Sequence, residues 1–272
     1  MLTLRDELLT GLWAAMRPLL STRVSAHRIL AGQLRGCRLV TSWRENPAAL
    51  LGYKERSLLR WMATHVGHGE TWLDVGAHHG YTALALSRLV GPEGRVLAFE
   101  PVLQTASCLA ATLSCNRLRH AVAVPLGLAE ATTLTPVDAR LVLGMAEHGR
   151  VGGDTTTIHV VALDAIWTVL AGGSRAVHGV KIDVQGMEVR TLEGMRELLR
   201  EFRPRLVVEF HPGVDRAAAD RLLDELGYQV PGVPVDGPDP AGGYADDHNY
   251  AFAPTMTVTA SCRAREAPGP RR

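Results

Sequence analysis

The chain has 272 residues, with 29 lysine and arginine residues against 28 aspartate and glutamate residues and a formal net charge of +1. This balance argues against a nucleic-acid-binding protein and against attraction to an acidic membrane surface, and no apolar run is long enough for a transmembrane helix. The length is sufficient for one α/β domain with an N-terminal extension. The four cysteines show no Cys-x-x-Cys spacing, so we expect reduced thiols, no bound metal and a cytoplasmic location.

The first part of the chain has apolar residues at helical spacing over residues 1–35, interrupted at Pro18. This periodicity predicts that residues 1–50 form an N-terminal helical extension. Its apolar face must cover something, so we expect it to act as a lid over the substrate pocket or to pair two subunits in a homodimer.

The segment from Thr71 to Gly80, TWLDVGAHHG, is an apolar run that ends in a glycine-bounded turn, and residues 80–90 follow with helical spacing. A strand, a tight turn and a helix N-terminus together predict a nucleotide-binding device. Gly76 and Gly80 lack the middle glycine of a dinucleotide fold and the lysine of a P-loop. Asp74 instead suits a ligand with a cationic amine, such as S-adenosylmethionine (SAM).

A second predicted strand, residues 95–99, ends at Glu100 and Pro101. In a doubly wound sheet an acid at this position can accept hydrogen bonds from both hydroxyls of a ribose. Pro101 removes an N–H where the strand must stop.

Further parallel strands are predicted at residues 121–127, 177–182 and 205–210, with a last strand at 249–253 and an antiparallel pair at 131–145 and 155–162. The pattern predicts an α/β fold whose central sheet is mostly parallel and flanked by helices. The carboxyl edge of that sheet would collect five polar residues: Asp74, Glu100, Asp183, Glu209 and His211.

The stretch LDVGAHHGYTALALSRLVGPEGRVLAFEPV, residues 73–102, resembles the first two motifs of class I SAM-dependent methyltransferases, and more narrowly the FkbM family of O-methyltransferases. Three further segments support the resemblance, which covers about residues 50–255: LGYKE at 51–55, VKIDVQGME at 180–188 and RLVVEFH at 205–211. His78 stands where the family usually has Asn, and Gln185 where it usually has Glu. The resemblance implies a Rossmann-like, seven-stranded sheet in a methyltransferase domain over residues 51–256, followed by a disordered tail over 257–272.

The resemblance also implies that SAM is the cofactor and S-adenosylhomocysteine the product. Leu128 is expected in a turn that borders the adenine, and Glu55 near the cofactor cleft. The full set of expected cofactor contacts is Glu55, Asp74, Gly76, Ala77, His78, Gly80, Tyr81, Glu100, Pro101, Leu128 and Asp183.

Methyl transfer to an alcohol needs a general base, because the hydroxyl has a high pKa. Asp183 and His211 are the candidates, since both follow predicted strands at the same sheet edge. We therefore expect an O-methyltransferase acting on a hydroxyl of a small natural product or a sugar, with no nucleic-acid or membrane partner. The alternatives are a non-catalytic SAM-binding module, an N-methyltransferase, or a nicotinamide-dependent oxidoreductase, which the missing middle glycine disfavours.

Overall fold

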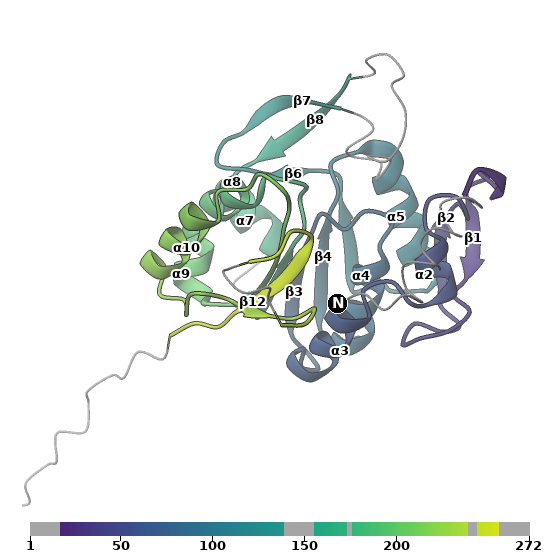
Figure 1. The fold of residues 1–272 in the computed structure, drawn as a ribbon, viewed down its shortest axis with the longest axis horizontal. Coiled ribbons are helices and arrows are strands. Elements are labelled where there is room, and N and C mark those ends of the chain that lie inside the picture. Colours follow the sequence, from purple (N-terminus) through teal and green to yellow (C-terminus); the bar gives the residue numbers. More distant parts are fainter. Residues whose placement is uncertain (1–16, 139–154, 173–175, 239–243, 256–272) are drawn as a thin grey trace, which may run out of the picture.

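The computed structural model describes residues 17–138, 155–172, 176–238 and 244–255. Within these residues the central sheet has seven strands in the order β11-β12-β10-β9-β3-β4-β5 (Figure 1). Their bounds are β3 Thr71–Val75, β4 Arg95–Phe99, β5 Ala121–Val124, β9 Gly179–Ile182, β10 Arg205–Phe210, β11 Val233–Pro234 and β12 His248–Phe252. The run from β10 to β5 is parallel, and β12 pairs antiparallel with both β10 and β11. The predicted fold class is confirmed.

Helices cover both faces of this sheet (Figure 1). One face carries α3 (Arg56–His65), α4 (Tyr81–Val90) and α5 (Leu103–Cys115). The other face carries α7 (Leu163–Ala171), α8 (Glu188–Glu193), α9 (Arg196–Phe202) and α10 (Arg216–Glu225). Among the helices of the described residues, none is both long and apolar enough to cross a membrane.

Strand β3 is buried at every residue because helices lie on both of its sides. Leu73 and Val75 pack in the cluster that includes α8, α9 and α10, and Trp72 packs in the cluster on the α3 and α4 side. Side chains alternate along a strand, so Asp74 points to the same side as Trp72. Asp74 therefore faces α4 and not the solvent.

The N-terminal segment differs from its prediction. Residues 1–16 lie outside the described residues, but the rest forms a short 3-10 turn (Arg17–Leu19), an antiparallel hairpin of β1 (Ser25–Arg28) and β2 (Arg38–Thr41), and helix α2 (Pro47–Leu51). The prediction of a helix through residue 35 is wrong for the described part. Two glycines explain this, because Gly32 and Gly36 both adopt positive φ (74° and 89°), which ends a helix and turns the chain between the two strands.

A second sheet in the order β6-β8-β7 is formed by β6 (Gly127–Leu128), β7 (Thr133–Asp138) and β8 (Thr155–Val161). The antiparallel pairing of β7 with β8 confirms the predicted pair of strands in this region. In Figure 1 this sheet lies beyond the ends of β3 and β4. The predicted strand at residues 121–127 is in fact divided between the two sheets, and the predicted tail at 257–272 lies outside the described residues.

Candidate active site

A cavity of about 430 Å³ lies at the carboxyl ends of β3, β4 and β9, with β6, β7 and β8 contributing to its wall. This volume is in the range of small-molecule and cofactor sites. Its walls are mainly apolar, and the polar groups enter from the ends of the central strands. The lining residues most relevant to a ligand are Gly76, His78, Glu100, Pro101, Leu128, Ile158, Val160, Asp183 and Val184.

The turn after β3 requires glycine at Gly76. Its φ is 81°, and a Cβ built there would lie 1.7 Å from the carbonyl oxygen of Asp183. The backbones that leave β3 and β9 therefore approach each other too closely for any side chain. This contact fixes Asp183 beside the turn at the cavity wall.

Glu100 ends β4 with its carboxylate held by two backbone groups. The N–H of His78 donates to Oε2 and the N–H of Val102 donates to Oε1, each at 3.0 Å. Burial raises the pKa of Glu100 to about 7, although these hydrogen bonds oppose the shift. The acid is thus fixed at the cavity wall, where it can accept hydrogen bonds from a ribose diol once it is deprotonated.

Asp74 lies behind the cavity wall, in an ion-pair network that sequence reasoning missed. The hydroxyl of Thr82 donates to Asp74 Oδ2 at 2.7 Å, and the Lys181 ammonium lies 3.6 Å from Oδ1. Lys181 is itself buried and lies 3.1 Å from Asp183 Oδ2. Burial raises the pKa of Asp74. Burial alone would lower the pKa of Lys181, but the carboxylates of Asp183 and Asp74 raise it and keep the ammonium charged. One signal pointed to Lys181: it is one of two lysines in the chain and interrupts an apolar strand.

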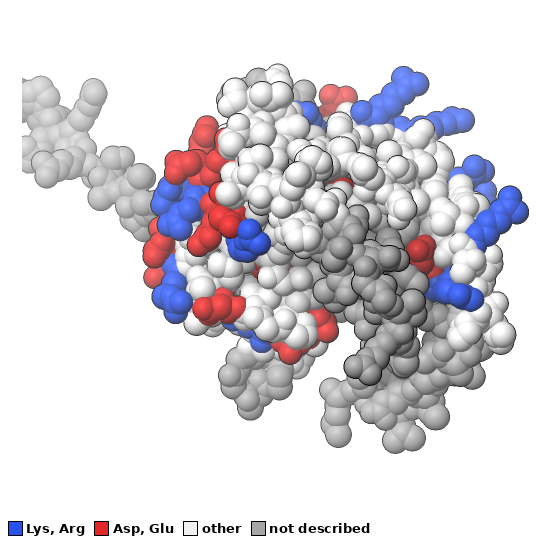
Figure 2. Space-filling model, turned by 90° about the horizontal axis from the view of Figure 1, so that it is seen from above, with Lys and Arg blue, Asp and Glu red and all other residues white. Residues whose placement is uncertain are grey.

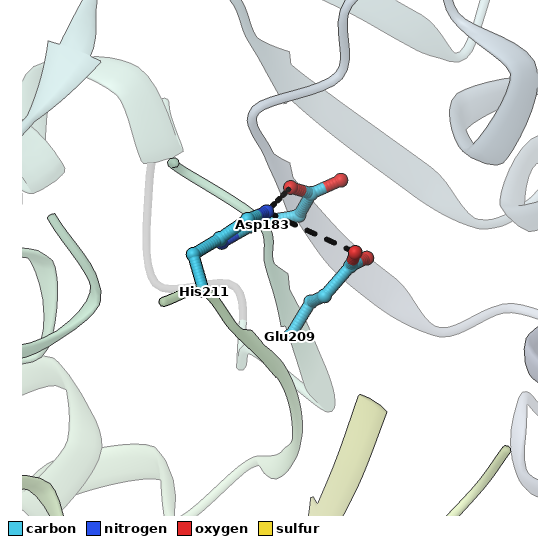
Figure 3. Close-up of side chains that lie close together, drawn as sticks. All are labelled: Asp183, Glu209 and His211. Atoms are coloured by element: carbon cyan, nitrogen blue, oxygen red, sulfur yellow. Dashed lines mark ion pairs between the residues drawn. The ribbon is translucent and has the colours of Figure 1, made fainter. Parts of the chain in front are cut away.

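His211 meets Asp183 and Glu209 at the sheet edge, as Figure 3 shows. Its Nε2 lies 3.5 Å from Asp183 Oδ1 and 3.8 Å from Glu209 Oε1. Its Nδ1 lies 2.7 Å from the buried Glu188 carboxylate. Gln185 also reaches the ring, with its Nε2 2.7 Å from His211 Nε2.

The three groups in Figure 3 have pKa values shifted by one another. Burial would lower the pKa of His211, but the hydrogen bond to Glu188 and the Asp183 carboxylate raise it. Burial would raise the pKa of Asp183, but Lys181 and His211 lower it. Burial, with repulsion from Asp183 and Glu55, raises the pKa of Glu209 to about 8. One atom from each of Asp183, Glu209 and His211 lies within 4.8 Å of the other two, so these residues could hold a metal ion.

A smaller cavity of about 30 Å³ adjoins the large one, and Lys54, Gly76, His78 and Asp183 line both. Glu55 and Tyr81 contribute to its wall. Burial raises the pKa of Glu55 above its usual value, and burial with the nearby Glu55 charge raises that of Tyr81 to about 12.

The structure divides the predicted cofactor residues into three groups. Gly76, His78, Glu100, Pro101, Leu128 and Asp183 line the large cavity. Glu55, Ala77 and Tyr81 line only the smaller one. Asp74 and Gly80 line neither: Asp74 is paired inside the protein, and Gly80 begins α4 at a φ of 91°.

These residues fit SAM. The apolar walls suit an adenine, Glu100 offers an acceptor for a ribose, and the carboxylates of Asp183 and Glu55 offer partners for an ammonium group. In addition, His78 Nε2 is buried and has no hydrogen-bond partner among the described residues, although His78 lines the cavity. Burial lowers the pKa of His78 well below its usual value, so the ring is neutral.

The chain was compared with curated proteins and with solved structures. A search of curated proteins found no match. Among solved structures, the chain is similar to a methyltransferase FkbM from Methylobacillus flagellatus (20% identity, TM-score 0.48), over 67% of this chain but 43% of that one. It is also similar to fibrillarin from Aeropyrum pernix with natively bound SAM (14% identity, TM-score 0.45, 85% of this chain and 82% of that one). A third similarity is to the O-methyltransferase TomG from Streptomyces achromogenes (16% identity, TM-score 0.45, 74% and 79%).

The family comparison concerns the segment that builds the cavity. The model of the methyltransferase FkbM domain matches residues 74–230, which is more than half of the chain. The matched segment begins at Asp74 and includes Glu100, Asp183 and His211. The chain belongs to the FkbM methyltransferase family and is a SAM-dependent methyltransferase.

Proposed function

We propose that this protein is an O-methyltransferase whose acceptor is a hydroxyl group of a small natural product or a sugar. The observation that supports it best is the convergence of Glu209 and His211 on Asp183, which lines the cavity. An alcohol oxygen must lose its proton as it takes a methyl group, so an acceptor hydroxyl needs groups that can receive that proton. These three side chains supply such groups at the carboxyl edge of the central sheet, where predicted cofactor residues also lie.

When bound, SAM supplies a methyl group attached to a sulfonium sulfur, and the thioether that remains is a good leaving group. The chain's own residues then position the acceptor and handle its proton. Asp183 and His211 can accept the proton, Glu188 orients the imidazole through Nδ1, and Lys181 limits the negative charge that accumulates around Asp183. The apolar walls around Val184 and Ile158 keep bulk water from the reacting groups.

The surface supports a small-molecule acceptor. On the face in Figure 2, Lys and Arg side chains of the described residues are scattered along the margins, and on one side they alternate with Asp and Glu. Nucleic-acid binding would instead favour a continuous basic patch. Pairing of two copies through the N-terminal segment stays a prediction, because residues 1–16 lie outside the described part of the chain.

The proposal is tested by incubating the purified protein with SAM and a panel of hydroxylated sugars and natural products, and locating the added methyl group by NMR. We expect a methyl ether, and we expect His211→Asn to slow its formation at least tenfold with cofactor binding retained. Glu197→Gln, which removes an exposed carboxylate whose ion-pair partner among the described residues is Arg200, is the matched control. Methyl transfer to nitrogen, or no transfer to any hydroxyl by protein that binds S-adenosylhomocysteine, would contradict the proposal.

A further inference from the structure

The three side chains in Figure 3 place their donor atoms around one point. Asp183 follows β9, Glu209 lies in β10, and His211 follows β10, so two neighbouring strands fix all three positions. Their donor atoms lie within 4.8 Å of one another, and His211 Nε2 is 3.5 and 3.8 Å from the two carboxylates. Two carboxylate oxygens and one imidazole nitrogen at this spacing can bind a single cation.

On each of Asp183 and His211, a neighbour takes up one side-chain atom. The other atoms, Asp183 Oδ1 and His211 Nε2, lie 3.3 and 2.7 Å from the Gln185 amide nitrogen. Glu188 takes up Nδ1 of His211 at 2.7 Å, so Nε2 is the nitrogen that faces the carboxylates. A carboxylate on the far nitrogen is the usual way in which a metal-binding histidine is oriented. Lys181 takes up Oδ2 of Asp183 at 3.1 Å, so Oδ1 is the oxygen that faces His211.

Glu209 supplies an independent observation. Its side chain is only 15% exposed, yet among the described residues its carboxylate accepts no hydrogen bond, and its ion-pair partner is His211 at 3.8 Å. A half-buried carboxylate without a close partner is costly. A cation bound to its oxygens would supply the partner that the described residues do not.

The local charge balance points the same way. Lys181 and His211 are surrounded by four buried or half-buried carboxylates: Asp74, Asp183, Glu188 and Glu209. With the lysine and the histidine both charged, ionisation of all four carboxylates would leave two negative charges, which a divalent cation would neutralise. Glu188 Oε2 is also buried without a hydrogen-bond partner among the described residues. Buried charges of this kind are normally paired or coordinate metals.

We propose that Asp183, Glu209 and His211 bind one divalent cation, Mn²⁺ or Mg²⁺, that holds the acceptor hydroxyl. Oxygen-rich sites with carboxylates suit these cations. A half-turn of the Gln185 amide would bring its oxygen to the point where its nitrogen now faces His211, which offers a fourth ligand.

This inference rests on the proposed O-methyl transfer and specifies how the hydroxyl is activated. A coordinated hydroxyl has a lower pKa than a free one. With the cation bound, His211 would be a ligand and no longer the proton acceptor, and the O–H proton would pass to the Glu209 oxygen that does not bind the cation. The electron pair of the O–H bond stays on the acceptor oxygen, which takes the methyl group.

The test is a titration of metal-stripped full-length protein with Mn²⁺, in which electron paramagnetic resonance measures free Mn²⁺. We expect one Mn²⁺ per chain, displaceable by Mg²⁺. Glu209→Gln and His211→Asn should each weaken binding at least tenfold, and Glu197→Gln should not change it. Circular dichroism checks that each variant is folded, and if neither variant folds, the stoichiometry and Mg²⁺ competition of the wild type decide.

Two results would overturn the cation site: no stoichiometric Mn²⁺ binding by the wild type, or equal binding by folded Glu209→Gln and His211→Asn. Two further outcomes distinguish failure of the cation site from failure of the proposed O-methyl transfer. Methyl ether formation that persists in excess chelator rejects the cation and leaves the O-methyltransferase intact. Stoichiometric Mn²⁺ binding with methyl transfer only to nitrogen rejects the acceptor class and leaves the cation site.

Discussion

Glu100 makes the stability of the cofactor-free protein depend on pH in a direction that can be worked out from its surroundings. Its pKa is about 7 in the folded protein against an ordinary 4.5, because burial favours the neutral acid. The folded state therefore keeps a proton that the unfolded chain releases above pH 4.5. The stabilisation from this proton is complete below pH 4.5 and is lost as pH rises through 7.

The difference can be measured against Glu100→Gln, which does not titrate. At 1.36 kcal/mol per pKa unit, the wild type should lose about 2–3 kcal/mol relative to this variant between pH 5 and pH 8. Urea unfolding at closely spaced pH values gives the two curves, and their difference removes contributions shared by both proteins. The exposed Glu197→Gln variant should instead run parallel to the wild type.

A constant difference between wild type and Glu100→Gln across this range would refute the reasoning, because it would mean that Glu100 titrates alike in the folded and unfolded states. A difference that changes in the opposite direction would mean that the two backbone N–H groups outweigh burial and lower the pKa. The same variant should bind S-adenosylhomocysteine more weakly than the wild type above pH 7, since its amide is a poorer acceptor for a ribose diol than a carboxylate.

Three further outcomes are expected from single substitutions. Thr82→Val should lower the free energy of unfolding by about 1–3 kcal/mol in urea titrations, because it leaves the buried Asp74 carboxylate without its hydroxyl donor. A change under about 0.5 kcal/mol would show that Lys181 satisfies Asp74 alone. Gly76→Ala should lower the free energy of unfolding by about 2 kcal/mol or more in the same assay, because the φ at this position is 81° and the added Cβ would meet the Asp183 carbonyl. Near-native stability would mean that the turn can move. Glu188→Gln should slow methyl transfer by about 10–100-fold with S-adenosylhomocysteine affinity unchanged, because it weakens the hydrogen bond that orients the His211 imidazole. An unchanged rate would contradict a role of this hydrogen bond in the reaction.

The central sheet could be predicted from the sequence because each buried strand ends in a distinctive residue. The run before Gly76 and the run before Glu100 are apolar and closed by residues that stop a strand, and parallel strands bring such ends to one edge. The placement of Glu100, Asp183 and His211 at this edge follows from that rule. The position of Asp74 along β3 was also predictable. Its direction toward α4 was not, because the sequence does not show which side of the strand this helix covers.

The N-terminal hairpin and the partners of the site residues could not be predicted. Apolar spacing over residues 1–35 suits a helix, and the turn at Gly32 is decided by packing, since a Cβ on Gly32 would lie 2.3 Å from the Gly52 carbonyl oxygen. The contact of Glu188 with His211 joins residues 23 positions apart, and sequence periodicity carries no such information.

The hairpin changes what counts as the folding unit. Leu34 and Leu39 from the hairpin, with Leu50 and Leu58, are buried in one cluster with Trp72 of β3, and Val40 donates its N–H to Thr112 of α5. A truncation that begins at residue 74, where the family match begins, would remove Thr71, Trp72 and Leu73 from β3 and uncover the apolar side of α4. Such a fragment should aggregate or stay unfolded. The carboxyl edge of the central sheet therefore depends on a layer of chain that precedes the matched segment.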